Sequence, residues 1–194
     1  IHHLSAIAKD QGYYLVYLPF AGLDDIVPQL RHFPDYEFFV YQPVSTATDD
    51  GHIHIRPFSR DGFQRDLHRC EGVICSAGFE LPSEAIHLGK KILAQPVAGQ
   101  MEQKSNAIAL EKLGLGTMAT TLDVATLARW LPLNAPTSPR NYPDVAKALV
   151  NWLMAGGGKN MEQLQQQLWQ EERRPINNPQ PKPVLAALKN SAGF

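Results

Sequence analysis

The sequence predicts an α/β fold, in which a doubly wound parallel sheet of about six strands is followed by a C-terminal helical tail. Short apolar runs such as residues 73–75 and 92–94 have the length and composition of buried strands. Each run ends at a turn that contains Gly or Pro and is followed by a segment with helical periodicity. The 194 residues, 44% of them hydrophobic, suffice for one domain with a buried core.

The first half of the chain supplies three of the expected strands. Residues 13–18 are aromatic or aliphatic throughout, and residues 37–41 form a second strand that ends at Gln42-Pro43. Residues 52–56 alternate between apolar and polar side chains, as a third strand would, and are followed by Pro57. Residues 45–51 are polar and are expected to form a turn. Asp24 and Asp25 favour the start of a helix, because acidic side chains suit its N-terminal dipole.

Three helices are expected around the two central apolar runs. One covers residues 61–70, and a second begins around Leu81 and Pro82 and ends at Gly89. A third follows a polar loop over 98–103 and ends at Gly114.

The last expected elements are a strand over 117–120, a helix capped by Asp123, and two helices over 144–154 and 161–172. Because the stretch 132–143 is rich in proline, we divide the chain into a lobe over 1–135 and C-terminal helices with an extended tail over 136–194.

Composition and charge exclude several classes of function. A net charge of −1 gives no electrostatic basis for binding nucleic acid. Two cysteines are too few for a disulfide framework, and no apolar run has the length of a membrane span, so a cytoplasmic location is expected. His52 and His54 share a strand face, but no third ligand is evident and no metal is expected.

Polar residues that follow the expected strands are candidates for a ligand site. Ser76, Ala77 and Gly78 form a strand-to-helix turn at which backbone N–H groups can bind an anion, although any such turn tolerates Ser and Gly. Glu84 has a carboxylate suited to vicinal hydroxyl groups; a surface residue that complements the helix dipole is the alternative.

A second polar cluster lies beyond Pro96. Gln100, Glu102 and Gln103 carry amide and carboxylate groups that pair well with hydroxyls. A solvated loop with a helix N-cap is the alternative interpretation.

Residues 72–116 carry these features in a fixed order: Ser76-Ala77-Gly78, Ser83-Glu84-Ala85, Gly89 followed by Pro96, Glu102-Gln103, and Asn106-Ala107. The region resembles the donor-nucleotide signature of GT-B glycosyltransferases, in particular the inverting groups that include plant and antibiotic UDP-glycosyltransferases and the N-acetylglucosaminyltransferase of peptidoglycan synthesis. The resemblance extends over residues 13–131 and implies a Rossmann-like C-terminal lobe that binds the donor nucleotide.

The resemblance also implies roles for individual residues. The diphosphate would lie at Ser76, Ala77, Gly78 and Phe79, the ribose at Glu84, the base between Phe58 and Ser59, and the donor sugar at Gln100, Glu102 and Gln103. The implied activity is transfer of a hexosyl or N-acetylhexosaminyl group from a nucleotide sugar, with UDP as the favoured carrier and with neither cofactor nor metal.

Two departures from the family pattern stand out. Lys90-Lys91 replaces a proline, and no cation lies beside the phosphate turn. Retaining members resemble one another in a second glutamate eight residues before the ribose glutamate, where this chain has Ser76. The inverting branch is therefore expected, with the general base and acceptor site in an N-terminal lobe outside this chain, so that the chain alone is inactive.

Two other functions stay open at this point. The chain could be a non-catalytic nucleotide-sugar-binding subunit of a two-chain transferase, or part of a GT-B nucleotide-sugar epimerase, which needs further acid and base carboxylates near the donor. The expected partners are the nucleotide sugar and the chain's own N-terminal lobe, with membrane contact only through that lobe. Leu164, Leu168 and Trp169 on the last helix predict weak self-association.

Overall fold

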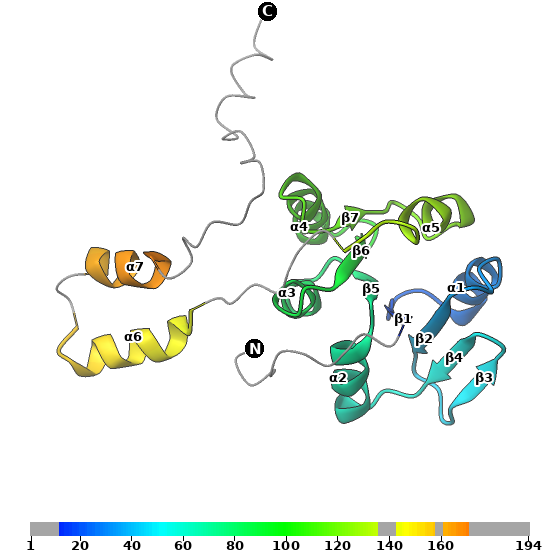
Figure 1. The fold of residues 1–194 in the computed structure, drawn as a ribbon, viewed down its shortest axis with the longest axis horizontal. Coiled ribbons are helices and arrows are strands. Elements are labelled where there is room, and N and C mark those ends of the chain that lie inside the picture. Colours follow the sequence, from blue (N-terminus) through cyan, green and yellow to red (C-terminus); the bar gives the residue numbers. More distant parts are fainter. Residues whose placement is uncertain (1–11, 136–142, 158–160, 171–194) are drawn as a thin grey trace, which may run out of the picture. The chain divides into compact units, whose positions relative to one another are not determined.

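The computed structural model describes residues 12–135, 143–157 and 161–170, and the chain divides into two compact units, one up to residue 141 and the other from residue 142. Each unit is described by itself, and Figure 1 shows the elements of both. The predicted division after residue 135 stays a prediction. The expected tail beyond residue 172 lies outside the described residues.

The first unit is built on a sheet of seven strands in the order β3-β4-β2-β1-β5-β6-β7. All neighbouring strands are parallel except β3 and β4, which are antiparallel. The strands are β1 (Tyr13–Tyr17), β2 (Glu37–Tyr41), β3 (Thr48–Asp50), β4 (Ile53–Arg56), β5 (Gly72–Ser76), β6 (Lys91–Gln95) and β7 (Thr117–Met118).

The sheet is doubly wound, as the sequence predicts. From the central β1 the chain proceeds outward to β2 and β4, and then returns to β5 on the other side of β1 before it proceeds to β6 and β7. The winding direction therefore reverses between β1 and β5, where Val16 is paired with Ile74. This is the topological switch point of the sheet.

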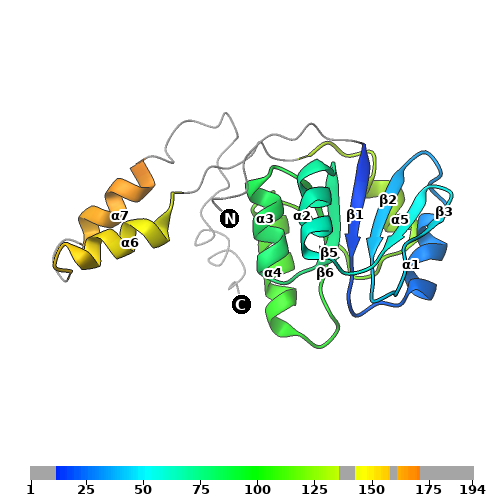
Figure 2. The ribbon, with the colours of Figure 1, turned by 90° about the horizontal axis from the view of Figure 1, so that it is seen from below.

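Helices cover both faces of the sheet, with α1 and α5 on one side and α2, α3 and α4 on the other (Figures 1 and 2). Their bounds are α1 (Leu23–Leu30), α2 (Arg60–Arg69), α3 (Glu80–His87), α4 (Met101–Lys112) and α5 (Val124–Trp130). The predicted cap of α5 is confirmed, because Asp123 Oδ1 accepts a 2.7 Å hydrogen bond from the backbone N–H of Thr126.

The core between the sheet and helices α1 and α5 holds the largest buried side chains. Trp130 is 1% exposed and meets the ring of Tyr14 edge-on at a centroid distance of 5.3 Å. Lys91 lies at the edge of this core, where its Nζ donates to the carbonyl oxygens of Leu131 and Leu133, both at 2.8 Å. The lysine at the position where the resemblance expects proline thus holds the end of α5 against the sheet.

Three sequence-based expectations need correction. The polar turn predicted over residues 45–51 contains β3, which forms because it pairs with β4. Helix α3 begins at Glu80, so Glu84 lies in its middle rather than near its start. Helix α4 begins at Met101, and Glu102 and Gln103 therefore belong to its first turn rather than to a loop.

The second unit contains α6 (Val145–Met154) and α7 (Met161–Gln170). Asp144 caps α6 through a 2.9 Å hydrogen bond from the backbone N–H of Lys147. No residue of α6 is buried. Within the described parts of the chain, none of the helices combines the length and hydropathy of a membrane span.

Candidate functional site

The carboxyl ends of β1, β4 and β5 are marked by exposed aromatic rings. Phe20, Phe58 and Phe79 follow these strands and are 72%, 51% and 74% exposed. Strands β4, β2, β1 and β5 are neighbours in this order and run parallel to one another, so the three rings lie at one edge of the sheet. Exposed rings gathered at a switch point indicate a surface that binds a ligand or another part of a protein.

A pocket of about 290 Å³ opens at this edge, between α2 and α3. It brings together Phe58, Ser59 and Glu84, which the sequence analysis assigned to the base and the ribose of one nucleotide. The complete lining comprises Tyr17, Tyr41, Phe58, Ser59, Arg60, Phe63, Gln64, Glu80, Leu81 and Glu84.

Aromatic rings form one wall of this pocket. Tyr17 meets Phe58 edge-on at 5.8 Å and Phe63 at 5.2 Å, and Tyr41 meets Phe63 at 5.1 Å. The side chain of Ser59 accepts a 3.2 Å hydrogen bond from the backbone N–H of Gly62 and so caps α2. The wall is therefore fixed by ring packing and by a helix cap.

Tyr41 is held in that wall from behind. Its hydroxyl donates a 2.8 Å hydrogen bond to Asp66, whose carboxylate is buried and also accepts from Arg65 Nε at 3.1 Å. Burial and the hydrogen bond to Asp66 both raise the pKa of Tyr41. The protonated hydroxyl is held by Asp66, so Tyr41 contributes its ring to the wall of the pocket.

The turn after β5 leads directly into α3. Ala77 is fully buried, and a Cβ added at Gly78 would meet no heavy atom within 4 Å, so packing does not require a glycine there. Helix α3 begins at this turn with Phe79 as its N-cap and has no side-chain cap. The first N–H groups of α3 therefore have no side-chain cap, and such groups at a helix start can bind an anion.

The structure adds a cation that sequence reasoning missed. Arg60, the first residue of α2, lines the pocket and forms no salt bridge among the described residues. It offsets the two carboxylates in the lining, Glu80 and Glu84. Arg60 directly follows Ser59, and this position in the sequence could have indicated that it belongs to the site. The approach of α2 to α3 is what brings Arg60 to the pocket.

The second polar cluster does not line the pocket. Gln103 Oε1 accepts a 3.0 Å hydrogen bond from the backbone N–H of Val97, and its Nε2 donates to Gln100 Oε1 at 2.7 Å. These bonds tie the loop after β6 to the first turn of α4. A contact of Gln100, Glu102 or Gln103 with a donor sugar stays a prediction.

No group of three or more potential metal ligands occurs in the described part of the chain. His52 bonds to the backbone oxygen of Leu30 at 3.1 Å, whereas His54 contacts Glu37 and Asp49, both at 2.8 Å. The two histidines therefore serve separate structural contacts.

A doubly wound sheet whose switch point carries an uncapped helix start and a nearby carboxylate is the arrangement of nucleotide-binding α/β proteins. The model of the family Glycosyl transferase family 1 matches residues 2–133, and the chain belongs to that family.

The fold matches that of a solved glycosyltransferase. The glycotransferase of kitacinnamycin is 16% identical with a TM-score of 0.51, over 86% of this chain and 46% of that one. SnogD from Streptomyces nogalater is 20% identical with a TM-score of 0.47, over 66% of this chain and 36% of SnogD. The spinosyn rhamnosyltransferase SpnG, complexed with thymidine diphosphate, is 19% identical with a TM-score of 0.49, over 64% of this chain and 38% of SpnG. The chain thus spans less than half of each. A comparison with curated proteins found no match.

Proposed function

We propose that this chain is the donor-binding, C-terminal lobe of an inverting glycosyltransferase that uses a nucleotide sugar, with UDP as the favoured carrier. The observation that supports it best is the pocket of about 290 Å³, which joins Phe58, Ser59 and Glu84 next to the uncapped start of α3. Membership of Glycosyl transferase family 1 supports the same reaction class.

Each part of a nucleoside diphosphate has a matching partner in the pocket. The base packs against Phe58, whose ring is half exposed and is held by Tyr17. The carboxylate of Glu84 accepts hydrogen bonds from the ribose hydroxyls. The diphosphate binds the N–H groups at the start of α3, and Arg60 supplies the positive charge that the turn itself lacks.

The reaction is a direct displacement. The acceptor hydroxyl oxygen bonds to the anomeric carbon, the bond from that carbon to the diphosphate breaks, and the leaving nucleotide takes the electron pair. A general base removes the hydroxyl proton. We assign that base and the acceptor site to an N-terminal lobe, which would face the edge that carries Phe20 and Phe79, and through which any membrane contact would occur.

A cytoplasmic location is part of the same proposal. The chain has two cysteines, too few for a disulfide framework, which suits a reducing compartment.

Calorimetric titration of the chain with UDP, dTDP and GDP tests the proposal. We expect saturable binding, tightest for UDP. Arg60→Gln should weaken that binding about tenfold or more, because a charge-assisted contact to phosphate is lost. The matched control is Arg31→Gln, which alters an exposed arginine paired with Asp50 away from the pocket. No heat of binding with any of the three nucleotides would overturn the proposal.

A further inference from the structure

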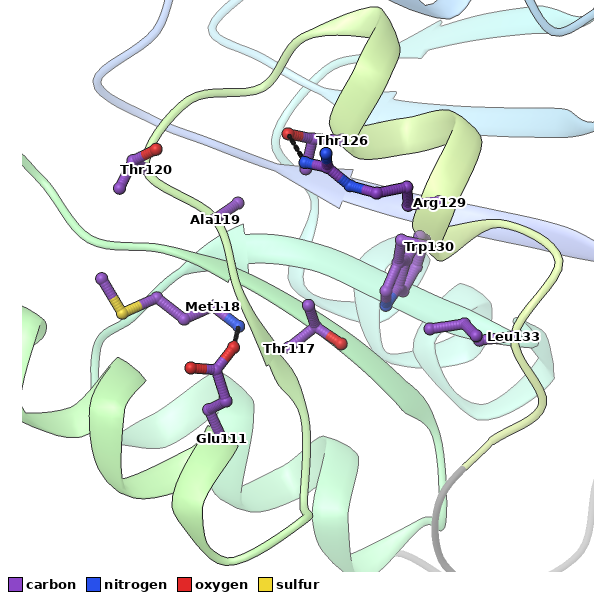
Figure 3. A pocket seen from close by; sticks show the side chains of 9 residues that line it. All are labelled: Glu111, Thr117, Met118, Ala119, Thr120, Thr126, Arg129, Trp130 and Leu133. Carbon is purple, nitrogen blue, oxygen red and sulfur yellow. Dashed lines mark hydrogen bonds between the residues drawn. The ribbon is translucent and has the colours of Figure 1, made fainter.

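A second pocket, of about 240 Å³, lies along the free edge of β7 and is separate from the pocket between α2 and α3. Its floor is the chain from Thr117 to Thr120, and its walls come from Glu111 on α4 and from Thr126, Arg129 and Trp130 on α5, with Leu133 beyond (Figure 3). It is smaller than the usual range for drug-sized ligands, ~300–1,000 Å³, and suits a small molecule.

The pocket contains a buried donor without a partner. Trp130 is 1% exposed, and its indole Nε1–H makes no hydrogen bond among the described residues. Figure 3 shows this nitrogen at the end of the ring that faces Thr117. Lys91 lies over the face of the same ring, 4.3 Å from its centroid, and an ammonium group cannot accept a hydrogen bond. Buried polar groups are normally paired, so this donor indicates a missing acceptor.

The same pocket is lined by a positively charged side chain, Arg129, which extends toward Thr126 (Figure 3). The guanidinium of Arg129 donates to Thr126 Oγ1 at 3.5 Å and forms no salt bridge within the described ranges. Asp123, the acid that interacts with Arg129, is committed to capping α5. Arg129 and Trp130 together therefore present donors and no acceptor to the pocket.

The opposite wall offers an acceptor. Glu111 Oε1 accepts a 3.3 Å hydrogen bond from the backbone N–H of Met118. This N–H group is the donor that β7 directs away from the sheet. This bond covers the strand edge and makes pairing with a further strand unfavourable. The carboxylate retains capacity to accept from a hydroxyl group of a ligand.

We propose that this pocket binds a small oxyanion that also carries a hydroxyl group, either a hydroxycarboxylate or a phosphate monoester. The oxyanion accepts from Trp130 Nε1 and Arg129, and the hydroxyl donates to Glu111. The pocket is a site in its own right, because none of these residues lines the pocket at the switch point.

The test follows the indole resonance of Trp130 by ¹H–¹⁵N NMR on the whole chain. Trp152→Phe and Trp169→Phe remove the other two indole signals, since the chain has three tryptophans. Glycerate and glycerol 3-phosphate, each to about 10 mM, distinguish the two oxyanions, and glycerol is the uncharged control. We expect a saturable shift with one of the anions and none with glycerol.

Arg129→Gln should reduce the apparent affinity about tenfold or more, whereas Arg31→Gln, at an exposed arginine near Asp50, should leave it unchanged. An unshifted indole resonance in ligand-free Arg129→Gln shows that the pocket is intact in that variant. Three results would overturn the inference: the absence of a saturable shift with either anion, an equal shift with glycerol, or an affinity for the anion that is unchanged in Arg129→Gln.

Discussion

The side-chain amide of Asn106, on α4, donates a 3.1 Å hydrogen bond to the carbonyl oxygen of Ala77, in the turn after β5. The bond joins the helix that follows β6 to the turn proposed to receive the diphosphate. It holds the backbone of that turn in place while the N–H groups on its other side remain accessible. Asn106 thus acts on the proposed site through Ala77, not through the ligand.

Asn106→Ala should weaken UDP binding and lower the free energy of unfolding by about 1 kcal/mol, because a partly buried carbonyl loses its partner. Urea denaturation and calorimetry measure the two effects. Ser105→Ala, at the exposed preceding residue, is the control and should change neither. Unchanged nucleotide affinity in Asn106→Ala would show that the turn does not depend on this bond.

Phe58→Ala should weaken nucleotide binding while it changes the free energy of unfolding only slightly. The ring is 51% exposed, so we expect a loss of stability of less than about 1 kcal/mol, together with a clear loss of nucleotide affinity because the base loses its packing surface. Leu113→Ala is the matched control, since Leu113 is 58% exposed and lies after α4. Equal effects of the two variants on nucleotide affinity would argue against a base at Phe58.

Sequence patterns predict elements whose signal is local. Strands β5 and β6 are buried on both faces and therefore form continuous apolar runs, and Asp123 caps α5 through residues only three positions away. Strand β3 has the polar sequence Thr-Asp-Asp and all its residues are exposed. It forms because it pairs with β4, three to seven positions along the chain, and because Asp50 and Asp49 contact Arg31 and Arg56, 19 and 7 positions away. Its polar composition alone indicates a turn and does not identify the strand.

The same distinction holds for the candidate site. Glu84 and Ser76-Ala77-Gly78 form a local order of motifs, whereas Arg60 on α2 and Tyr41 on β2 meet Glu84 in one pocket only in the folded chain. The amide of Gln103, predicted to meet a sugar, instead forms hydrogen bonds to Val97 and Gln100 in the loop that precedes α4. A side chain suited to hydroxyl groups also suits the backbone, and sequence alone does not decide between them.

Tyr41→Phe should destabilise the fold by about 1.5–3 kcal/mol, the range for a hydrogen bond to a charged group, because it leaves the buried carboxylate of Asp66 with one partner fewer. Urea denaturation measures the change. Tyr36→Phe is the control, since the Tyr36 hydroxyl makes no hydrogen bond to the described residues. Equal stability of the two variants would show that the Tyr41–Asp66 bond adds nothing to the fold.

Lys91 should make stability depend on pH. Burial lowers the pKa of its ammonium from 10.5 to about 8. Between these values the unfolded chain binds more protons than the folded one, so the contribution of Lys91 to the free energy of unfolding rises with pH from about 8 toward 10.5. Below that window both states are protonated and the contribution is constant.

Denaturation of wild type and Lys91→Met at about pH 7.5 and about pH 9.5 isolates this effect. The pKa of the Cys75 thiol, raised to about 12 by burial, lowers stability over the same window, but it does so in both proteins and cancels in the difference. The stability of wild type relative to Lys91→Met should be greater at the higher pH. A pH-independent difference would contradict the lowered pKa, and Lys112→Met, at an exposed lysine, controls for loss of charge.

The most direct test of the central claim asks whether Glu84 recognises the ribose hydroxyl groups. UDP and its 2′,3′-dideoxy analogue are titrated into wild type, Glu84→Gln and the control Glu162→Gln, which alters an exposed glutamate of α7. We predict that wild type and the control prefer UDP about tenfold or more and that Glu84→Gln loses most of this preference, because the two hydroxyls no longer meet a carboxylate. An equal preference for UDP in all three proteins would contradict the placement of the ribose at Glu84.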